Sequence, residues 1–245
     1  LGAEGPRTYL VLAQNNHELR STGGFISGVG LVRVEHGKVT QLRFQDSYTV
    51  DDLEQPHRPA PEALRQLMGT GLLLLRDANW WPNFATSAQV AAQLYRQDQG
   101  QAVDGVLAVD LTSLQLLLQA TGPLAVPGYD QMVSSDNMLS ILMAYWQAPL
   151  LTAPGKEGTD WWLHRKDLAA DLMAELVPRL MAETRAVDLP RLATALGQAL
   201  RERHFLVYVN DTSAQAILDE MGWSGNLRPT SGDYLLVVDT NVGFN

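Results

Sequence analysis

The chain has 245 residues, 46% of them hydrophobic, which is enough to fill the core of one large domain or two small ones. Its formal net charge of -9 argues against a protein that wraps nucleic acid, because such binding depends on clustered Lys and Arg. There is no Cys, which excludes disulfides, thiolate metal sites and cysteine nucleophiles together.

Strand-like runs occupy the first part of the sequence. Apolar stretches at 8–13 and 25–34 are typical of buried strands, and residues 39–46 return after a His-Gly-Lys turn. The second and third strands are therefore expected to form a hairpin. The polar residues 14–24 are expected to form a loop at the mouth of the sheet, where a Gly-Gly pair lets the backbone come close to another group.

Helical and strand patterns alternate through the rest of the chain. Helices are expected at 61–68, 86–98, 111–120, 135–147, 160–184, 192–201 and 214–221, and strands at 106–109, 205–209 and 234–239. Asp110 is expected to cap the third of these helices, and Thr86 or Ser87 the second. The alternation predicts an α/β fold, a three-layer α-β-α sandwich with a mixed central sheet that includes the antiparallel hairpin. A single domain over residues 1–245 is expected.

Standard catalytic signatures are missing from the sequence. The glycine-rich stretch 23–30 leads into a strand, and no Gly-Lys-Ser/Thr follows, which argues against a nucleotide-binding loop. The five histidines include no pair at metal-ligand spacing, and there is no Gly-x-Ser-x-Gly elbow. Glu18 with Asp46 could form a glycosidase-like carboxylate pair, but two acids among 27 carry little information.

The polar stretch 14–24 contains candidates for an anion site. Arg20 could clamp a phosphate or carboxylate, or it could pair with Glu18 and hold the loop in place. Asn15, Asn16 and Thr22 could likewise bond a ligand or the loop backbone. Both interpretations stay open.

Arg165 and Lys166 lie within the first two turns of the helix expected from about residue 160. Cations at a helix N-terminus oppose the helix dipole by roughly 0.3 to 1 kcal/mol. A bound anion would reverse that effect, because the free N–H groups and both cations would then act together. The alternative is an Arg that packs its stem on the core and keeps its charge in water.

Further motifs extend along the whole chain. After the opening run from Tyr9 to Ile26 they are Asp77-Ala-Asn-Trp80, Pro82-Asn-Phe84, Val103-Asp-Gly-Val106, Ala120-Thr-Gly-Pro123, Arg165-Lys-Asp167, Arg203-His204, Gly222-Trp223 and Gly232-Asp-Tyr-Leu235 with Asn241. Together they resemble a bacterial family, domain of unknown function 4012. Members of that family look like envelope proteins with an N-terminal membrane helix. The resemblance implies an extracytoplasmic domain, membrane-anchored in the full-length protein and excised here from a longer chain.

The order of elements is also similar to the LytR-CpsA-Psr family, whose members attach glycopolymers from a polyprenyl-pyrophosphate carrier to the bacterial cell wall. Those proteins use arginines and Mg²⁺ at the pyrophosphate. Arg20 matches the Arg of that family's Arg-Ser-Asp-Thr motif, whereas Thr22 replaces its metal-binding Asp. Asp46 matches the Asp of the Arg-Asp-Thr-Tyr motif, and Arg165-Lys166 falls where a late helix carries an Arg-Gln pair.

This second resemblance implies a domain that binds, and as a phosphotransferase transfers, a phosphorylated polyprenyl lipid or its glycan. Arg20 and Asp46 would be catalytic, with Asp46 also holding Mg²⁺. The implied ligand-binding residues are Asn15, Asn16, Glu18, Thr22, Arg165 and Lys166. The alternative is a non-catalytic structural or interaction module of the cell envelope, in which the same polar residues only fix the end of the sheet.

Overall fold

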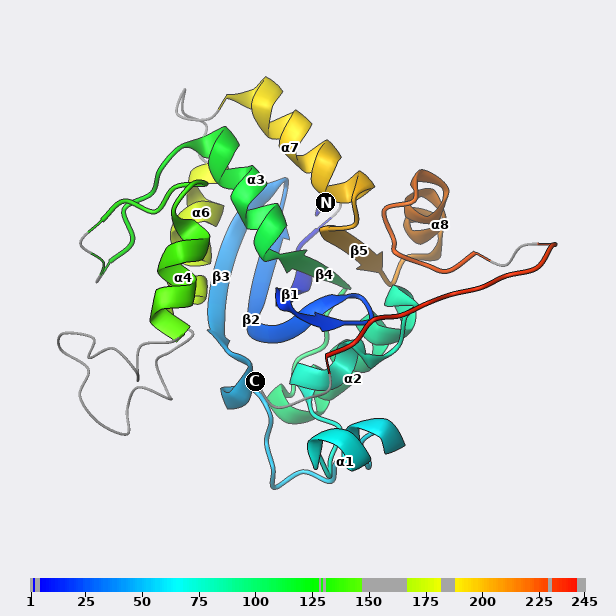
Figure 1. Cartoon of the computed structure of the whole chain (residues 1–245). Coiled ribbons are helices and arrows are strands. Elements are labelled where there is room, and N and C mark those ends of the chain that lie inside the picture. Colours follow the sequence, from blue (N-terminus) through cyan, green and yellow to red (C-terminus); the bar gives the residue numbers. More distant parts are fainter. Residues whose placement is uncertain are drawn as a thin grey trace.

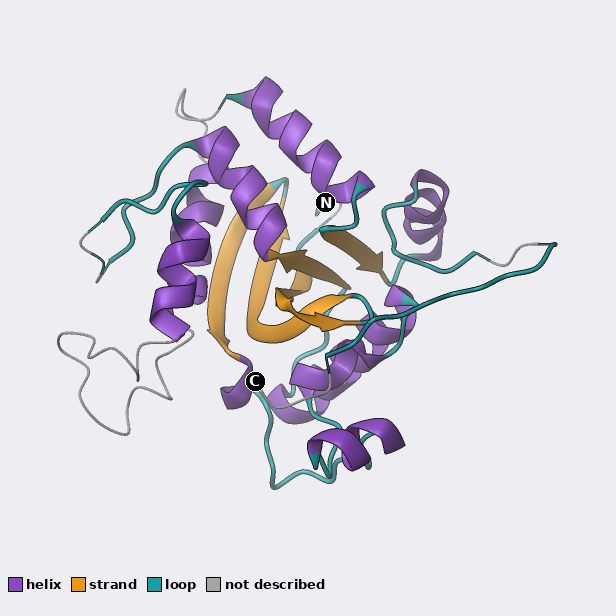
Figure 2. Cartoon of the chain, viewed as in Figure 1, coloured by secondary structure: helices purple, strands orange, loops and turns teal. Residues whose placement is uncertain are grey.

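The computed structural model describes residues 2, 5–127, 129, 131–146, 167–181, 188–228 and 231–241. A five-stranded sheet runs through the middle of the molecule, and helices cover both of its faces (Figures 1 and 2). The α/β class and the mixed sheet predicted from the sequence are therefore confirmed.

The strand β1 (Arg7–Arg20) occupies the centre of the sheet, whose order is β3-β2-β1-β4-β5. The other strands are β2 (Gly23–Glu35), β3 (Lys38–Asp46), β4 (Gly105–Asp110) and β5 (Phe205–Val209). β1 runs parallel to β4, and all the other pairs of this sheet are antiparallel. The predicted hairpin is formed by β2 and β3.

The helices follow in the order that the sequence predicts. They are α1 (Glu62–Met68), α2 (Phe84–Gln99), α3 (Leu111–Thr121), α4 (Met138–Trp146), α6 (Asp167–Met181), α7 (Leu189–Arg201) and α8 (Thr212–Met221), with 3-10 segments η1 (Ser47–Thr49) and η2 (Leu75–Trp80). Asp110 caps α3 as predicted. The cap predicted for α2 was wrong, because the side chain of Asn83, and not that of Thr86 or Ser87, accepts the first-turn N–H.

Each face of the sheet carries its own hydrophobic core, because successive side chains of a strand point to opposite faces. Tyr9 and Val11 of β1 belong to a core shared with α3, α4 and α6, whereas Leu10 and Leu12 belong to one shared with α2 and η2. All four side chains are buried. The sheet between two helical layers is the three-layer arrangement that the sequence predicts.

The polar stretch 14–24 is not the loop that was expected, because it continues β1 and leads through a tight turn into the antiparallel strand β2. The pair Asn15–Phe25 is followed by the pair Leu19–Gly24, so residues 16–18 bulge out of β1. The bulge brings the two backbones very close, since a Cβ on Gly24 would lie 2.0 Å from the carbonyl oxygen of Asn15. The Gly-Gly pair thus serves the close approach of two strands.

The strand expected at 234–239 does not join the described sheet. The segment has no regular secondary structure, and Leu235 is 86% exposed. Beyond it, the backbone N–H of Asn241 donates to the carbonyl oxygen of Leu19 at 2.9 Å. The apolar composition of this run resembles that of a strand, but no described strand pairs with it.

Replacing Gly24 with Ala should destabilise the fold, because the added methyl group would press on the Asn15 backbone, which can move only with β1. We expect a loss of about 1–3 kcal/mol in the free energy of unfolding, measured by urea denaturation. The matched control is Gly71→Ala, where a Cβ would meet nothing within 4 Å. Equal stability of the two variants would contradict the account of the bulge.

Candidate functional site

A polar pocket lies at the end of the sheet where β4 ends and its parallel pairing with β1 stops. Gln14 of β1 pairs there with Asp110 of β4. The pocket has a volume of about 330 Å³, and its polar lining residues are Asn16, Ser21, Thr22, Asp110, Glu202, Arg203 and His204. Ligands of α/β sheets commonly bind outside the carboxyl ends of the strands, so this position favours a binding site.

Asp110 links three segments of the pocket. One carboxylate oxygen accepts the Ser113 N–H at 2.8 Å and thereby caps α3. The other oxygen lies 2.7 Å from Nδ1 of His204 and accepts from the Asn16 amide at 3.3 Å. Asn16 also donates to the hydroxyl of Thr112 at 2.9 Å. The bulge of β1, the end of β4 and the start of β5 are therefore joined through one carboxylate.

Burial raises the pKa of the Asp110 carboxyl, and the hydrogen bonds from the Ser113 N–H and the His204 ring partly oppose that rise. When Asp110 is ionised, Nδ1 of His204 donates to it, and Nε2 becomes the nitrogen available to other groups. Nε2 lies 3.9 Å from a carboxylate oxygen of Glu202. A histidine oriented in this way by a carboxylate can act as a general base or as a hydrogen-bond donor.

Two lining residues carry buried polar atoms that have no hydrogen-bond partner. These atoms are the hydroxyl oxygen of Thr22 and the side-chain oxygen of Asn16. The side-chain amide nitrogen of the neighbouring Gln14 is also buried and has no hydrogen-bond partner. Thr22 is only 7% exposed. Because an unsatisfied buried polar group costs about 1–3 kcal/mol, these atoms favour a polar ligand or water in the pocket.

Arg20 does not line this pocket. Its side chain is buried, its guanidinium donates to the carbonyl oxygens of Leu19 and Asn241, and its Cζ lies 5.4 Å from the centre of the Phe25 ring. Burial raises the pKa of the nearby Asp77 carboxyl, and the positive charges of Arg76 and Arg20 partly offset that rise. A phosphate could reach the Arg20 guanidinium only by displacing these partners.

The other residues predicted around Arg20 are spread along the end of the sheet. Asn15 donates to Glu18 at 3.0 Å and accepts the His17 N–H at 3.1 Å, which holds the bulge in shape. Asp46 lies at the end of β3, where it pairs with Gly28 of β2. Because β3 is two strands away from β1, roughly 10 Å separates Asp46 from β1. No ion pair joins Arg20 to Glu18 among the described residues. Their roles toward a ligand stay predictions.

Arg165 and Lys166 lie outside the described residues, so their proposed place beside Arg20 and Asp46 also stays a prediction. Asp46 accepts the Tyr48 N–H at 2.9 Å and belongs to no group of three metal-ligating side chains in the described part of the chain. Mg²⁺ is commonly bound by one or two carboxylates together with phosphate oxygens. Asp46 therefore fits Mg²⁺ only in combination with a phosphorylated ligand.

A second, apolar cavity of about 410 Å³ lies on the sheet face that carries α3 and α6. Its lining is almost entirely aliphatic and aromatic and comes from all five strands and from α3, α6 and α7. Lining residues on the strands are Val11, Val32, Val34, Val39, Phe44, Leu107, Val109 and Phe205, and those on α6 are Met173, Leu176, Val177 and Leu180. Such an environment suits an apolar ligand.

Asp110 and His204 were not predicted as site residues. The sequence placed Asp110 after a buried strand but assigned it only a helix cap, and His204 appeared only in a family motif. A usable signal was the strand pattern itself, because a parallel β1–β4 pair brings Asp110 beside the polar stretch 14–24. The contact with His204 depends on β5, which lies 94 residues further along the chain.

A family described as "Protein of unknown function (DUF4012)" matches residues 4–145, as the motifs predict. No curated protein matches the sequence.

Several solved structures are similar to this chain at low sequence identity. Protein gbs0355 from Streptococcus agalactiae is 12% identical, with a TM-score of 0.47, over 90% of this chain and 73% of that chain. TagV from B. subtilis is 9% identical, with a TM-score of 0.42, over 90% and 80%. A structure of TagT bound to LI-WTA is 9% identical, with a TM-score of 0.34, over 88% and 75%. At these TM-scores the similarities carry no argument about fold or activity.

Replacing Asp110 with Asn should change how stability depends on pH. Because folding raises the pKa of Asp110, its contribution is greatest below the unfolded pKa and is lost as the pH rises through the folded pKa. The Asn variant lacks this titration, so its deficit relative to the wild type should shrink between about pH 4 and about pH 7 in urea denaturation. The exposed Asp136→Asn is the control, and a deficit that stays constant or grows would contradict the prediction.

Proposed function

This chain belongs to the family described as protein of unknown function DUF4012, and we propose that it binds a phosphorylated envelope lipid, with the apolar chain of the lipid in the cavity under α6. The lipid class is a polyprenyl phosphate or pyrophosphate that carries a glycan for attachment to the cell wall. Binding is the core of this proposal, and phosphotransfer is its extension.

The observation that carries the proposal is the apolar cavity itself. Protein interiors are close-packed, and voids larger than a water molecule are few. Apolar side chains that line such a space would stay in contact with water if nothing filled it, and covering apolar surface is favourable. The aliphatic lining therefore favours an apolar occupant.

The shape of the cavity favours a chain over a compact molecule. Val39 and Phe44 both line it and lie five residues apart on β3, which corresponds to about 17 Å along the strand. The lining extends from the β2–β3 turn at Gly37 to Val109 at the end of β4 and Ser113 in the first turn of α3. A linear hydrocarbon can follow such a path along the strands.

The head group is proposed to lie at the polar end of the sheet. Val109 and Phe205 line the apolar cavity, and their chain neighbours Asp110 and His204 line the polar pocket. Arg20, Arg165 and Lys166 would then neutralise phosphate charge, with Asp46 holding Mg²⁺ and with Asn15, Asn16, Glu18 and Thr22 as orienting groups. An extracytoplasmic position beside the membrane accords with such a ligand. No helix in the described part of the chain is long and apolar enough to span a membrane.

A specific observation also favours the second candidate, a non-catalytic envelope module. Asn15 and Glu18 bond to each other across the bulge, and Arg20 is bonded to the backbone of Asn241. These contacts give Asn15, Glu18 and the Nη1 atom of Arg20 partners within the chain. The two candidates differ in whether a phosphorylated lipid binds more tightly than its alcohol.

A bulky side chain that fills the apolar cavity should weaken lipid binding. Val177→Trp places a bulky ring in the apolar lining, so affinity for a short-chain polyprenyl phosphate should fall at least about tenfold in isothermal titration calorimetry. Leu189→Trp, at a position that is 71% exposed on α7, is the matched control. If Val177→Trp unfolds, Leu180→Trp tests the same wall. If folded Val177→Trp or Leu180→Trp binds the lipid as tightly as Leu189→Trp does, the proposal is wrong.

The charged groups should add affinity that depends on phosphate and on Mg²⁺. We expect a polyprenyl pyrophosphate to bind more tightly than the alcohol of the same chain length, and Mg²⁺ to increase that difference. Asp46→Asn keeps an oxygen for the Tyr48 N–H but removes the charge, so it should lose the Mg²⁺ increment. Asp52→Asn, which can keep its bond to the Glu54 N–H, should retain it. Equal affinities for pyrophosphate and alcohol would support the non-catalytic module.

A further inference from the structure

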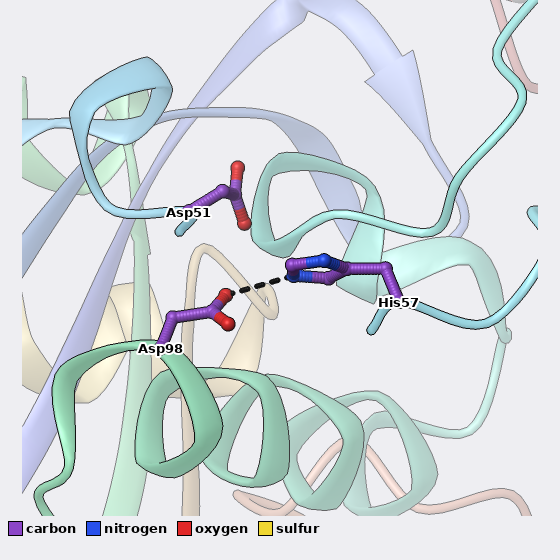
Figure 3. Close-up of side chains that lie close together, drawn as sticks. All are labelled: Asp51, His57 and Asp98. Carbon is purple, nitrogen blue, oxygen red and sulfur yellow. Dashed lines mark hydrogen bonds and ion pairs between the residues drawn. The ribbon is translucent and has the colours of Figure 1, made fainter. Parts of the chain in front are cut away.

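Three side chains of metal-ligand type meet away from both cavities. They are Asp51, which follows η1, His57, which precedes α1, and Asp98, in the last turn of α2 (Figure 3). One ligand atom of each lies within 4.8 Å of the others. None of the three lines the polar pocket or the apolar cavity. The cluster therefore needs its own explanation.

Burying the two carboxylates of this cluster costs free energy unless a positive charge or a proton compensates their negative charges. The side chains of His57 and Asp98 are 0% exposed, and that of Asp51 is 3% exposed. Carboxylates removed from water are stable only when they are paired, protonated or bound to a metal. Arg76 is a neighbouring cation, with a nitrogen 3.6 Å from Asp51 and its guanidinium stacked on the Tyr48 ring.

The hydrogen bonds of His57 leave one ring nitrogen directed at the cluster. Nδ1 lies 3.0 Å from the backbone carbonyl oxygen of Gln55, so Nδ1 carries a hydrogen and donates it. In the neutral ring Nε2 then carries a lone pair and no hydrogen, and it lies 3.1 Å from a carboxylate oxygen of Asp98. Two acceptors cannot bond to each other, so a proton or a metal ion must lie between them. An Nδ1–H bonded to a carbonyl is the usual support of a metal-ligating histidine.

Asp51 supplies the independent observation that points to a ligand. One of its oxygens accepts the Leu75 N–H at 2.7 Å. The other, Oδ2, is buried and accepts no hydrogen bond, although it lies 3.6 Å from Nη1 of Arg76. Figure 3 shows this carboxylate directed toward the imidazole of His57 and the carboxylate of Asp98. A buried carboxylate oxygen that is open toward an imidazole nitrogen is a ready metal ligand.

We propose that Asp51, His57 and Asp98 bind one divalent transition-metal ion, Zn²⁺ or Mn²⁺, through two carboxylate oxygens and the imidazole Nε2. The proton that would otherwise bridge His57 and Asp98 is released as the metal enters. Metal–ligand bonds of about 2.0–2.2 Å need the three atoms closer than 4.8 Å, which side-chain rotation can supply. Imidazole as a ligand favours these ions over Mg²⁺.

The site would fasten the segment after β3 to the end of α2. Two glutamines already join these elements, because Gln99 donates to the carbonyl oxygen of Val50 at 2.6 Å and Gln97 donates to that of Pro56 at 3.4 Å. A metal between Asp51, His57 and Asp98 would add a stronger link at the same place. The metal would therefore hold η1 and the neighbouring end of β3 in position.

The rival explanation is a metal-free ion pair between protonated His57 and Asp98. Burial alone would lower the pKa of His57, but the hydrogen bond and the charge of Asp98 outweigh it and raise that pKa. The ion pair accounts for His57 and Asp98, but it leaves Oδ2 of Asp51 without a hydrogen bond, with the ion pair to Arg76 at 3.6 Å as its electrostatic contact.

The test is metal binding to chelator-treated protein. Titration with Co²⁺, followed by visible absorption, and competition with Zn²⁺ should show one tight site per chain and a rise in Tm with metal concentration. His57→Asn should weaken binding about 100-fold. His36→Asn, at an exposed histidine of the β2–β3 turn, should bind like the wild type.

Wild-type protein that binds no Co²⁺ or Zn²⁺ at millimolar concentration would overturn the proposal, as would a folded His57→Asn that binds as tightly as His36→Asn. If His57→Asn does not fold, the ring nitrogens of His57 in the wild type decide the question by NMR. Addition of Zn²⁺ should shift the Nε2 resonance to the metal-bound range. An unchanged Nε2 resonance would leave the ion pair as the correct description.

Discussion

β1 is buried on both faces and paired on both edges, and the rest of the structure depends on that position. Its alternating apolar residues supply two cores at once, one under α2 and one under α3 and α6. Its parallel pairing with β4 brings two strand ends together, and its bulge then turns Asn16 toward Asp110. The polar pocket exists because β4 ends beside the bulge of the central strand, which runs in the same direction.

The sheet separates two environments that a phosphorylated lipid would need together. One face holds an aliphatic cavity, and the end of the sheet holds carboxylates, amides and a histidine. Val109 and Asp110 are adjacent in the chain and line different cavities. The alternation of side chains along a strand thus places a polar group within one residue of an apolar one. The metal cluster at Asp51 would support the neighbouring end of β3 and does not belong to either cavity.

Local patterns predicted most of the fold, because they depend on residues close in sequence. The β2–β3 hairpin, the cap at Asp110 and the β4–α3 unit all follow from spacing and turn chemistry. The stretch 14–24 was predicted wrongly as a loop, because polar residues in a bulged strand look like solvated ones. The run 234–239 has the composition of a strand, and whether it pairs depends on tertiary structure.

The site was harder to predict, because its contacts are long-range. His204 meets Asp110 only through the pairing of β5 with β4, and Asp51 meets Asp98 only through the packing of a loop on α2. The histidines were judged by their spacing along the sequence, and that spacing does not reveal a cluster from three segments. Arg20 was predicted to bind an anion or to pair with Glu18, and its burial beside Phe25 and Asn241 depends on tertiary contacts that the sequence does not show.

The central claim is that the cavity under α6 holds the chain of a lipid. The most direct measurement is photo-crosslinking with a polyprenyl phosphate that carries a diazirine near the end of its chain, followed by peptide mass spectrometry. The account predicts labels on Met173, Leu176 and Val177 of α6 and on Val39 or Phe44 of β3, all reduced by unlabelled lipid. Labels confined to the exposed run 235–238, or labels that unlabelled lipid does not reduce, would contradict it.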